Sequence, residues 1–196
     1  MNIYTLPCLD SIDWSKCEAQ PISQCRWSPN AAPAATVQGL YLKDRALVFR
    51  LVSSAPPARA ENAGPDSAVW EDCCLECFFS FDGLNYVNLE ANANSALRAS
   101  FGPGRHGRSF LKDMEISMPT AQAKALDKGW ELVFTVPLDA VDALWGCRPK
   151  SGDSFGANFY SCGDKTPAPH YAAWNSVETE SPDFHRPEYF GKVIIG

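Results

Sequence analysis

Apolar and polar residues alternate along two adjacent segments of this chain, 74–81 and 85–93, and a period of two predicts a pair of β-strands. One face of the pair collects Leu75, Cys77, Phe79, Phe81, Val87, Leu89, Ala91 and Ala93. The other face collects Cys74, Glu76, Phe78, Ser80, Tyr86, Asn88, Glu90 and Asn92. The first face is suited to a hydrophobic core. The second carries carboxylates and amides, so it either meets water or binds something polar.

Short alternating segments recur along most of the chain and predict a fold that is almost entirely β. Besides the first pair, the expected strands are 36–43, 46–53, 96–101, 114–118, 130–136, 154–161 and 192–195. Only 137–145 is expected to be helical, with Asp139 as its N-cap. Many short strands bounded by turn residues indicate an all-β, two-sheet antiparallel β-sandwich of jelly-roll type. Its core should contain Leu47, Phe49, Leu51, Leu75, Cys77, Phe79, Val87, Leu89, Leu132 and Phe134.

The chain is expected to form a single domain over residues 1–196, with 1–35 the least informative part. The proline-rich segment 160–191 shows no clear period, and long loops of this kind are often functional. Its aromatic residues Phe184, Tyr189 and Phe190 are interpreted as packing against the sandwich. Trp174, flanked by alanines and Asn175, is expected to be exposed. Four other tryptophans are interpreted as packing residues: Trp14, Trp27, Trp130 and Trp145.

Charge and hydropathy exclude several classes of partner. The net charge of −6 argues against nucleic acid, because binding to phosphates depends on clustered Lys and Arg. The only basic cluster is Arg105, His106 and Arg108, which is too small to change this conclusion. No run approaches the roughly 18 apolar residues of a membrane span. The N-terminus shows no secretory signal, so we expect a cytoplasmic location.

Eight cysteines suggest disulfides, but a reducing compartment favours free thiols acting as small hydrophobes. Cys73, Cys74 and Cys77 lie on one expected strand, where neighbouring side chains point to opposite faces and cannot all bind one ion. A zinc site would need Cys162, His170 or His185 from far along the chain. The sequence therefore predicts reduced cysteines and no structural metal.

The segment WEDCCLECFF at 70–79 resembles the strand signature of carbohydrate-binding module family 9. The segments NFYSCG at 158–163 and PDFHRP at 182–187, together with Pro169-His170-Tyr171 and Trp174-Asn175, resemble the C-terminal half of a bacterial subgroup of that superfamily. The resemblance extends over roughly residues 46–196. It implies a β-sandwich that holds a sugar ring between two tryptophans, with charged and amide side chains binding the hydroxyl groups.

Carried onto this sequence, the resemblance places Trp70 and Trp174 at the two stacking positions, Glu76 at the acidic position and Arg98 at the basic one. Further candidates for binding a saccharide ligand are Asn88, Asn92, Asn158 and His170. Relatives often hold structural calcium, for which the oxygen ligands here would be Asp66, Glu71, Asp72, Asp82 and Asp164. These residues are not densely spaced, so we expect weak calcium binding or none, and no other cofactor.

Three alternatives remain open at this point. Glu76 and Arg98 would also fit a cross-strand ion pair. A glycoside-acting enzyme would use paired carboxylates such as Glu76 and Glu90, whose separation the sequence does not give. A haem-carrying electron-transfer sandwich would need axial ligands, for which Met114, Met118 and His106 are available, although CxxCH is absent. The sequence contains no GxSxG, HExxH, P-loop or Rossmann motif, so non-catalytic binding is the main prediction.

Overall fold

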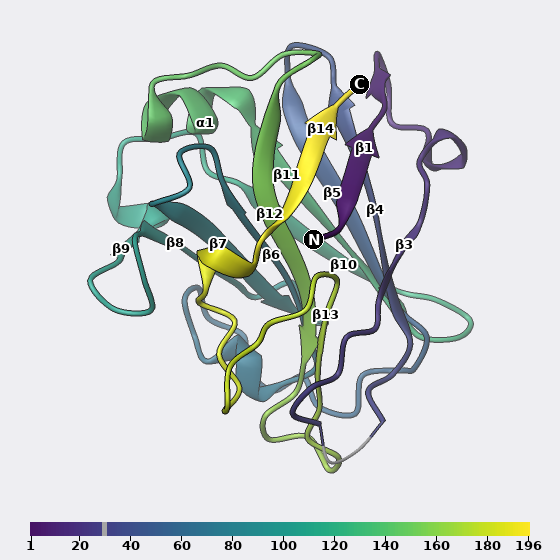
Figure 1. The fold of residues 1–196 in the computed structure, drawn as a ribbon. Coiled ribbons are helices and arrows are strands. Elements are labelled where there is room, and N and C mark those ends of the chain that lie inside the picture. The colour runs from purple at the N-terminus through teal and green to yellow at the C-terminus, as the bar shows by residue number, and fades with distance from the viewer. Residues whose placement is uncertain (29–30) are drawn as a thin grey trace.

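Two β-sheets pack face to face, as the alternation predicted (Figure 1). The computed structural model describes residues 1–28 and 31–196. The strands are β1 Ile3–Leu6, β2 Cys8–Leu9, β3 Gln20–Ile22, β4 Ala35–Leu42, β5 Ala46–Ser53, β6 Cys74–Ser80, β7 Tyr86–Asn92, β8 Leu97–Gly102, β9 Ser109–Phe110, β10 Thr120–Ala125, β11 Trp130–Pro137, β12 Ser154–Cys162, β13 Tyr171–Ala173 and β14 Gly191–Ile195. The helix is α1 Leu138–Trp145, and the 3₁₀ turns are η1 Trp14–Lys16, η2 Val69–Glu71, η3 Leu111–Asp113 and η4 Pro187–Tyr189.

Within the described residues, the larger sheet has the order β1-β14-β12-β6-β7-β8-β9, with β13 also paired to β12. The smaller sheet has the order β10-β11-β5-β4-β2, with β3 also paired to β4. Two pairings, β1 with β14 and β2 with β4, are parallel rather than antiparallel as expected. Pro7 alone separates β1 from β2, so the N-terminal run passes from one sheet to the other without reversing direction. In Figure 1, purple β1 lies beside yellow β14, which brings the two chain ends into one sheet.

The core lies between the sheets and contains all ten residues that the alternation predicted. Each is at most 1% exposed. Cross-strand partners such as Phe134 with Phe49, and Cys77 with Leu89, place apolar side chains in register on the inner faces. Trp130 is also buried in this core, as expected. The predicted all-β, two-sheet sandwich is therefore confirmed.

Two local predictions were wrong. Residues 114–118 are not a strand, because the chain makes the η3 turn and then runs irregularly to β10. β10 itself was missed because its alternation, TAQAKA, places only alanines at the apolar positions, and these small side chains give a weak hydrophobic signal. Asp139 is not the N-cap of α1. Pro137 holds that position, and Asp139 lies in the first turn, where it pairs with Arg148.

The outer face of the larger sheet is also covered. A second apolar cluster forms there between β6, β7 and β12 and the long segment from 163 to 190. Phe184 and Phe190 are buried in this cluster, and Tyr189 packs against it, as predicted. Because loops cover this face, the side chains of β6 and β7 are buried on both sides of the sheet.

Gly129, in the turn before β11, is a position where the fold requires glycine. Its φ is +86°, and a Cβ built there would lie 1.9 Å from the Ser53 carbonyl oxygen. We expect Gly129→Ala to lower the free energy of unfolding by about 3 kcal/mol, since left-handed strain and a backbone clash add together. Gly83 is the matched control: its φ is +72°, but open space surrounds it, so Gly83→Ala should cost about 1 kcal/mol. Equal losses for the two variants in denaturant unfolding would contradict this assignment.

Candidate functional site

A cavity of about 530 Å³ opens on the outer face of the larger sheet, within the range of small-molecule sites. Strands β6, β7 and β8 and the end of β12 form its floor. Its walls come from η2, the connection between β12 and β13, the loop after β8 and the segment before η4. The lining residues are Trp70, Glu76, Asn88, Glu90, Arg98, Ser100, Arg105, His106, Arg108, Cys162, Asp164, Tyr171, Pro182, Asp183, Phe184 and His185.

One cross-strand row of three charged side chains crosses the floor. Glu76 on β6 pairs in register with Glu90 on β7, and Glu90 pairs with Arg98 on β8. Residues directly opposite one another share a face and lie close together. Glu76 is 3% exposed and Glu90 is 4% exposed. The structure thus brings Glu76 and Arg98 to one site, but the register partner of Arg98 is Glu90 rather than Glu76.

The two carboxyl groups of this row disfavour each other's ionisation. Burial raises the pKa of Glu76 well above its usual value, and the charge of Glu90 adds to the rise. Burial also raises the pKa of Glu90 to about 7, against the opposing effects of Arg98 and of a hydrogen bond from Asn88. Near neutral pH the pair therefore retains a proton, so it can both donate and accept hydrogen bonds.

A second polar row holds the first in place. Asn88 Nδ2 donates to Glu90 Oε1 at 2.7 Å, and Asn88 Oδ1 accepts from Ser100 Oγ and from Arg108 Nη2, each at 2.7 Å. The Arg108 guanidinium lies 3.9 Å from the ring centroid of Tyr86 and donates to its carbonyl. Burial lowers the pKa of Arg108. Asn88 was predicted from the sequence, whereas Arg108 was treated only as part of a basic cluster. The partners of Arg108 lie on strands rather than beside it in the chain, so the sequence around it did not indicate them.

Trp70 forms one wall. Its indole is half-buried, and the Arg98 guanidinium lies 5.0 Å from the ring centroid. The backbone N–H of Asp164 donates to the Trp70 carbonyl at 3.0 Å. Burial and the Asp164 carboxylate raise the pKa of Tyr171 to about 12, and the two side chains share a hydrogen bond. Trp70, Asp164 and Tyr171 therefore belong to one rim of the cavity.

Phe184 and His185 form another wall. Phe184 stacks on Tyr160 with centroids 4.1 Å apart and an angle of 15° between the rings. His185 Nδ1 lies 2.8 Å from the Tyr86 hydroxyl oxygen. Burial, together with the charge of Arg108, lowers the pKa of His185 to about 4. This imidazole is therefore neutral at physiological pH.

The prediction that Trp174 is exposed was wrong. Its side chain is 1% exposed and packs in the core against Tyr4 and Phe159, with centroid distances of 6.4 and 5.6 Å. The physical reason is the strand period. Ala172 and Trp174 point into the core, while Tyr171 and Ala173 point to the outer face. Trp174 lies three positions after Tyr171, an odd number, so the period of two that predicted the other strands also predicts opposite faces here.

Asn92 does not line the cavity either. Its Nδ2 donates to Asp72 Oδ2 at 2.7 Å, and its Oδ1 accepts from the backbone N–H groups of Asn94 and Ala96. It therefore closes the turn after β7. Asp72 is fully buried; burial opposes its ionisation, but hydrogen bonds from Asn62 and Asn92 lower its pKa overall.

Asn158 and His170 also lie outside the lining. Asn158 exchanges hydrogen bonds with the backbone of Asn175, its Nδ2 donating to the carbonyl and its Oδ1 accepting from the N–H, each at 2.9 Å. It therefore fixes the chain after β13. His170 is 5% exposed, and its Nδ1 lies 3.0 Å from the Ala168 carbonyl. Both residues hold the long loop in place.

The calcium candidates are dispersed. Three of them form ion pairs: Asp66 with Lys112, Glu71 with Lys165 and Asp72 with Arg59. Asp82 accepts backbone hydrogen bonds in the β6–β7 turn, and Asp164 lines the cavity. Over residues 1–28 and 31–196, these carboxylates do not converge in groups of three. Weak calcium binding or none remains a prediction.

A family model described as carbohydrate-binding family 9 matches residues 7–195, nearly the whole chain. The chain belongs to carbohydrate-binding family 9. No curated protein matches it significantly. The helices in the described part of the chain are all too short or too polar to cross a membrane.

Several solved structures share this fold. A Bacteroides uniformis protein, for which carbohydrate binding is inferred, is 23% identical with a TM-score of 0.83, and the alignment covers 99% of each chain. A family 9 module from Caldicellulosiruptor kristjanssonii, solved with cellotriose, is 13% identical with a TM-score of 0.65, covering 99% of this chain and 93% of that one. The glucose complex of a module from that organism has a TM-score of 0.69 at 13% identity, covering 100% and 96%.

The two tryptophans first assigned to one site should differ in their effect on stability. We expect Trp174→Ala to lower the free energy of unfolding by about 3–5 kcal/mol, because it removes a fully buried indole. Trp70→Ala removes a half-buried one and should cost about 1 kcal/mol. Denaturant unfolding of both variants measures the difference, and a small loss for Trp174→Ala would show that its side chain is not in the core.

The raised pKa of Glu90 predicts a pH-dependent stability. A carboxyl whose folded pKa exceeds its unfolded value near 4.3 binds more protons when folded, so stability falls as pH rises from about 4.5 to about 7. The Glu90→Gln variant has no ionisable group at this position, so its stability should fall less than that of wild type over this pH range. Its free energy of unfolding, relative to wild type, should rise by about 1–3 kcal/mol between pH 5 and pH 8. Glu115→Gln, at an exposed glutamate, should not change with pH in this way; a similar profile for both variants would refute the assignment.

Proposed function

We propose that the cavity binds a saccharide and leaves it chemically unaltered. The family match over residues 7–195 supports this function. The observation that carries the proposal is the half-buried Trp70 indole beside the row formed by the buried Glu76 and Glu90 and the half-buried Arg98. An apolar aromatic surface next to hydrogen-bonding groups is the pairing that a sugar needs.

A pyranose ring offers an apolar face of C–H groups and a rim of hydroxyl groups. The C–H face would pack on Trp70, since indoles contribute a large apolar surface with defined geometry. Each hydroxyl both donates and accepts, and a carboxyl pair that retains a proton lets this floor do the same. Arg98 adds a charge-assisted donor at the edge.

Tyr171 takes the place proposed from the sequence for a second tryptophan. It lines the cavity and contacts the rings of Trp27 and Phe184 edge-on, with centroids 6.5 and 6.3 Å apart. These contacts fix its ring before a ligand arrives. A sugar that contacts Trp70 and Tyr171 therefore needs no contact with the buried Trp174.

The neighbouring structures suggest which sugars to test first. The family 9 modules from Caldicellulosiruptor kristjanssonii were solved with glucose and with cellotriose. A cavity of about 530 Å³ can hold a short saccharide of this kind. Glucose and cellotriose are therefore suitable probes.

The same carboxylates raise the alternative of a glycosidase. Such enzymes flank the scissile bond with two carboxyl groups, one of which is ionised as base or nucleophile. Here Glu76 and Glu90 come from adjacent strands of one floor, so they meet a ligand from the same side, and both have a raised pKa. Binding without cleavage fits this arrangement better, and we expect no glucose release from cellotriose after prolonged incubation.

Sugar affinity tests the proposal directly. We expect Trp70→Ala to weaken binding of cellotriose at least about tenfold in calorimetric titration, because stacking contributes on the order of 1 kcal/mol beyond the buried area. Trp14→Ala is a matched control. Trp14 is also a half-buried indole in a 3₁₀ turn with an arginine over its ring, Arg50 at 6.0 Å, but it packs on the smaller sheet.

The control should bind as wild type does. Equal weakening by both substitutions would show a general effect on folding rather than a contact with the sugar. If wild type binds neither probe, a glycan array extends the search, and an array without any bound saccharide would overturn the proposal.

A further inference from the structure

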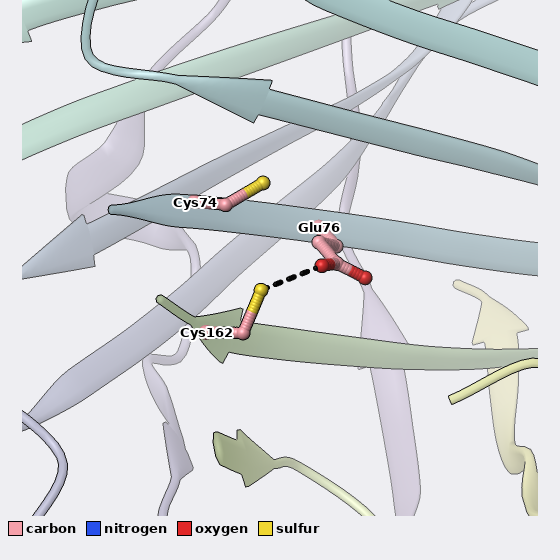
Figure 2. Close-up of side chains that lie close together, drawn as sticks. All are labelled: Cys74, Glu76 and Cys162. Atoms are coloured by element: carbon pink, nitrogen blue, oxygen red, sulfur yellow. Dashed lines mark hydrogen bonds between the residues drawn. The ribbon is translucent and has the colours of Figure 1, made fainter. Parts of the chain in front are cut away.

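Three side chains with metal-binding atoms converge where β6 meets the end of β12. Cys74 and Cys162 are directly opposite partners in the antiparallel pairing of these strands. Glu76 lies two residues from Cys74 on β6, so its side chain points to the same face. Figure 2 shows the Cys162 thiol directed at the Glu76 carboxylate of the neighbouring strand, with Cys74 on the same strand as Glu76.

The distances suit a small metal ion. Cys162 Sγ donates to Glu76 Oε1 at 3.0 Å, and the three ligand atoms all lie within 4.8 Å of one another. Two sulfur ligands of one tetrahedral zinc ion lie about 3.8 Å apart, given Zn–S bonds of about 2.3 Å. Among the described residues this is the only such group of three. We infer that Cys74, Glu76 and Cys162 form a binding site for a thiophilic divalent cation of the zinc class.

The donor set selects the type of ion. Two thiolates favour soft or borderline cations such as Zn²⁺, whereas Ca²⁺ and Mg²⁺ need oxygen ligands. Three anionic ligands also more than neutralise the charge of a divalent cation, which strengthens their hold on it. All three donors lie on strands rather than on loops, so the site is held rigidly.

The surroundings indicate an open coordination position. Glu76 and Cys162 line the cavity, whereas Cys74 is 1% exposed and does not line it. A bound ion would thus lie at the cavity floor, with its fourth position toward the cavity, where water completes the tetrahedron. This inference does not depend on sugar binding.

Protons occupy the site in the absence of metal. Burial raises the pKa of Cys74 to about 12, and the hydrogen bond with Cys74 and burial raise that of Cys162. Zinc must displace these thiol protons, so its apparent affinity should increase with pH. The inference departs from the prediction of no metal that was made from the sequence. Glu76 and Cys162 lie 86 positions apart, and the sequence did not indicate that they contact each other.

The test uses the full chain with its two exposed thiols, Cys25 and Cys147, replaced by serine to prevent binding elsewhere. The reduced protein is titrated with Zn²⁺ and with Co²⁺ at pH 8. We expect one ion per chain, a sulfur-to-cobalt charge-transfer absorption, and a rise in melting temperature with zinc concentration. Affinity at pH 6 should be at least tenfold lower.

Matched variants separate the site from general thiol binding. Cys162→Ser and Cys74→Ser should abolish the charge-transfer absorption. Cys77→Ala removes a buried thiol from the same strand on its core face, and should retain it. Glu76→Gln keeps the shape of the side chain and both sulfurs, so it should retain the absorption with at least tenfold weaker binding.

Three results would overturn the inference. The first is no stoichiometric binding at pH 8. The second is binding that survives in folded Cys162→Ser and Cys74→Ser proteins, as judged by circular dichroism. The third is a disulfide between Cys74 and Cys162 in freshly purified protein. In this case the protein would bind zinc only after reduction, and the disulfide would then form again in preference to the zinc complex.

Discussion

Burial of both faces of β6 and β7 is the constraint on which the site depends. The inner faces pack into the core, and the long C-terminal segment covers the outer ones. A polar group removed from water must find a partner inside the protein, because an unpaired one costs several kcal/mol. Asn88 therefore bonds to Glu90, Ser100 and Arg108, and Cys162 bonds to Glu76. The carboxyl pair also lines the cavity, which is why it is suited to a ligand.

The sequence predicted those parts of the structure that follow from local periodicity. Alternation identified β5, β6, β7 and β11 within one or two residues, and these strands supply all ten predicted core residues. It failed where the hydrophobic signal is weak, as in β10, an edge strand that turns only the small side chains of Ala121 and Ala123 toward the core. It also failed for β1, whose place beside β14 depends on the meeting of the two chain ends. Such pairings are long-range, and no local pattern encodes them.

The residues of the site also divide into those that local periodicity predicts and those that long-range packing determines. Glu76 and Arg98 were assigned from the resemblance to family 9, and Asn88 from its place on the same polar face, and the strand register does bring the three to one site. Trp174 was misassigned because its aromatic identity was given more weight than its position in the alternation, three residues after Tyr171. Arg108, Phe184 and His185 were missed because they reach the cavity from loops, where the direction of a side chain follows from packing and not from a period.

The wall and the floor of the cavity are joined through the backbone. The Trp70 carbonyl accepts a hydrogen bond from the Asp164 N–H, and Glu71 accepts one from the Lys165 N–H, each at 3.0 Å. The η2 turn is thus fixed to the chain that leaves β12, directly after Cys162. An aromatic wall held in this way loses little conformational freedom when a ligand binds. The binding free energy of the ligand is therefore not reduced by the cost of ordering a loop. For the saccharide proposed here, the arrangement favours ligands that fit the existing shape, and the same two backbone hydrogen bonds connect Trp70 to the end of β12, where Cys162 pairs with Cys74.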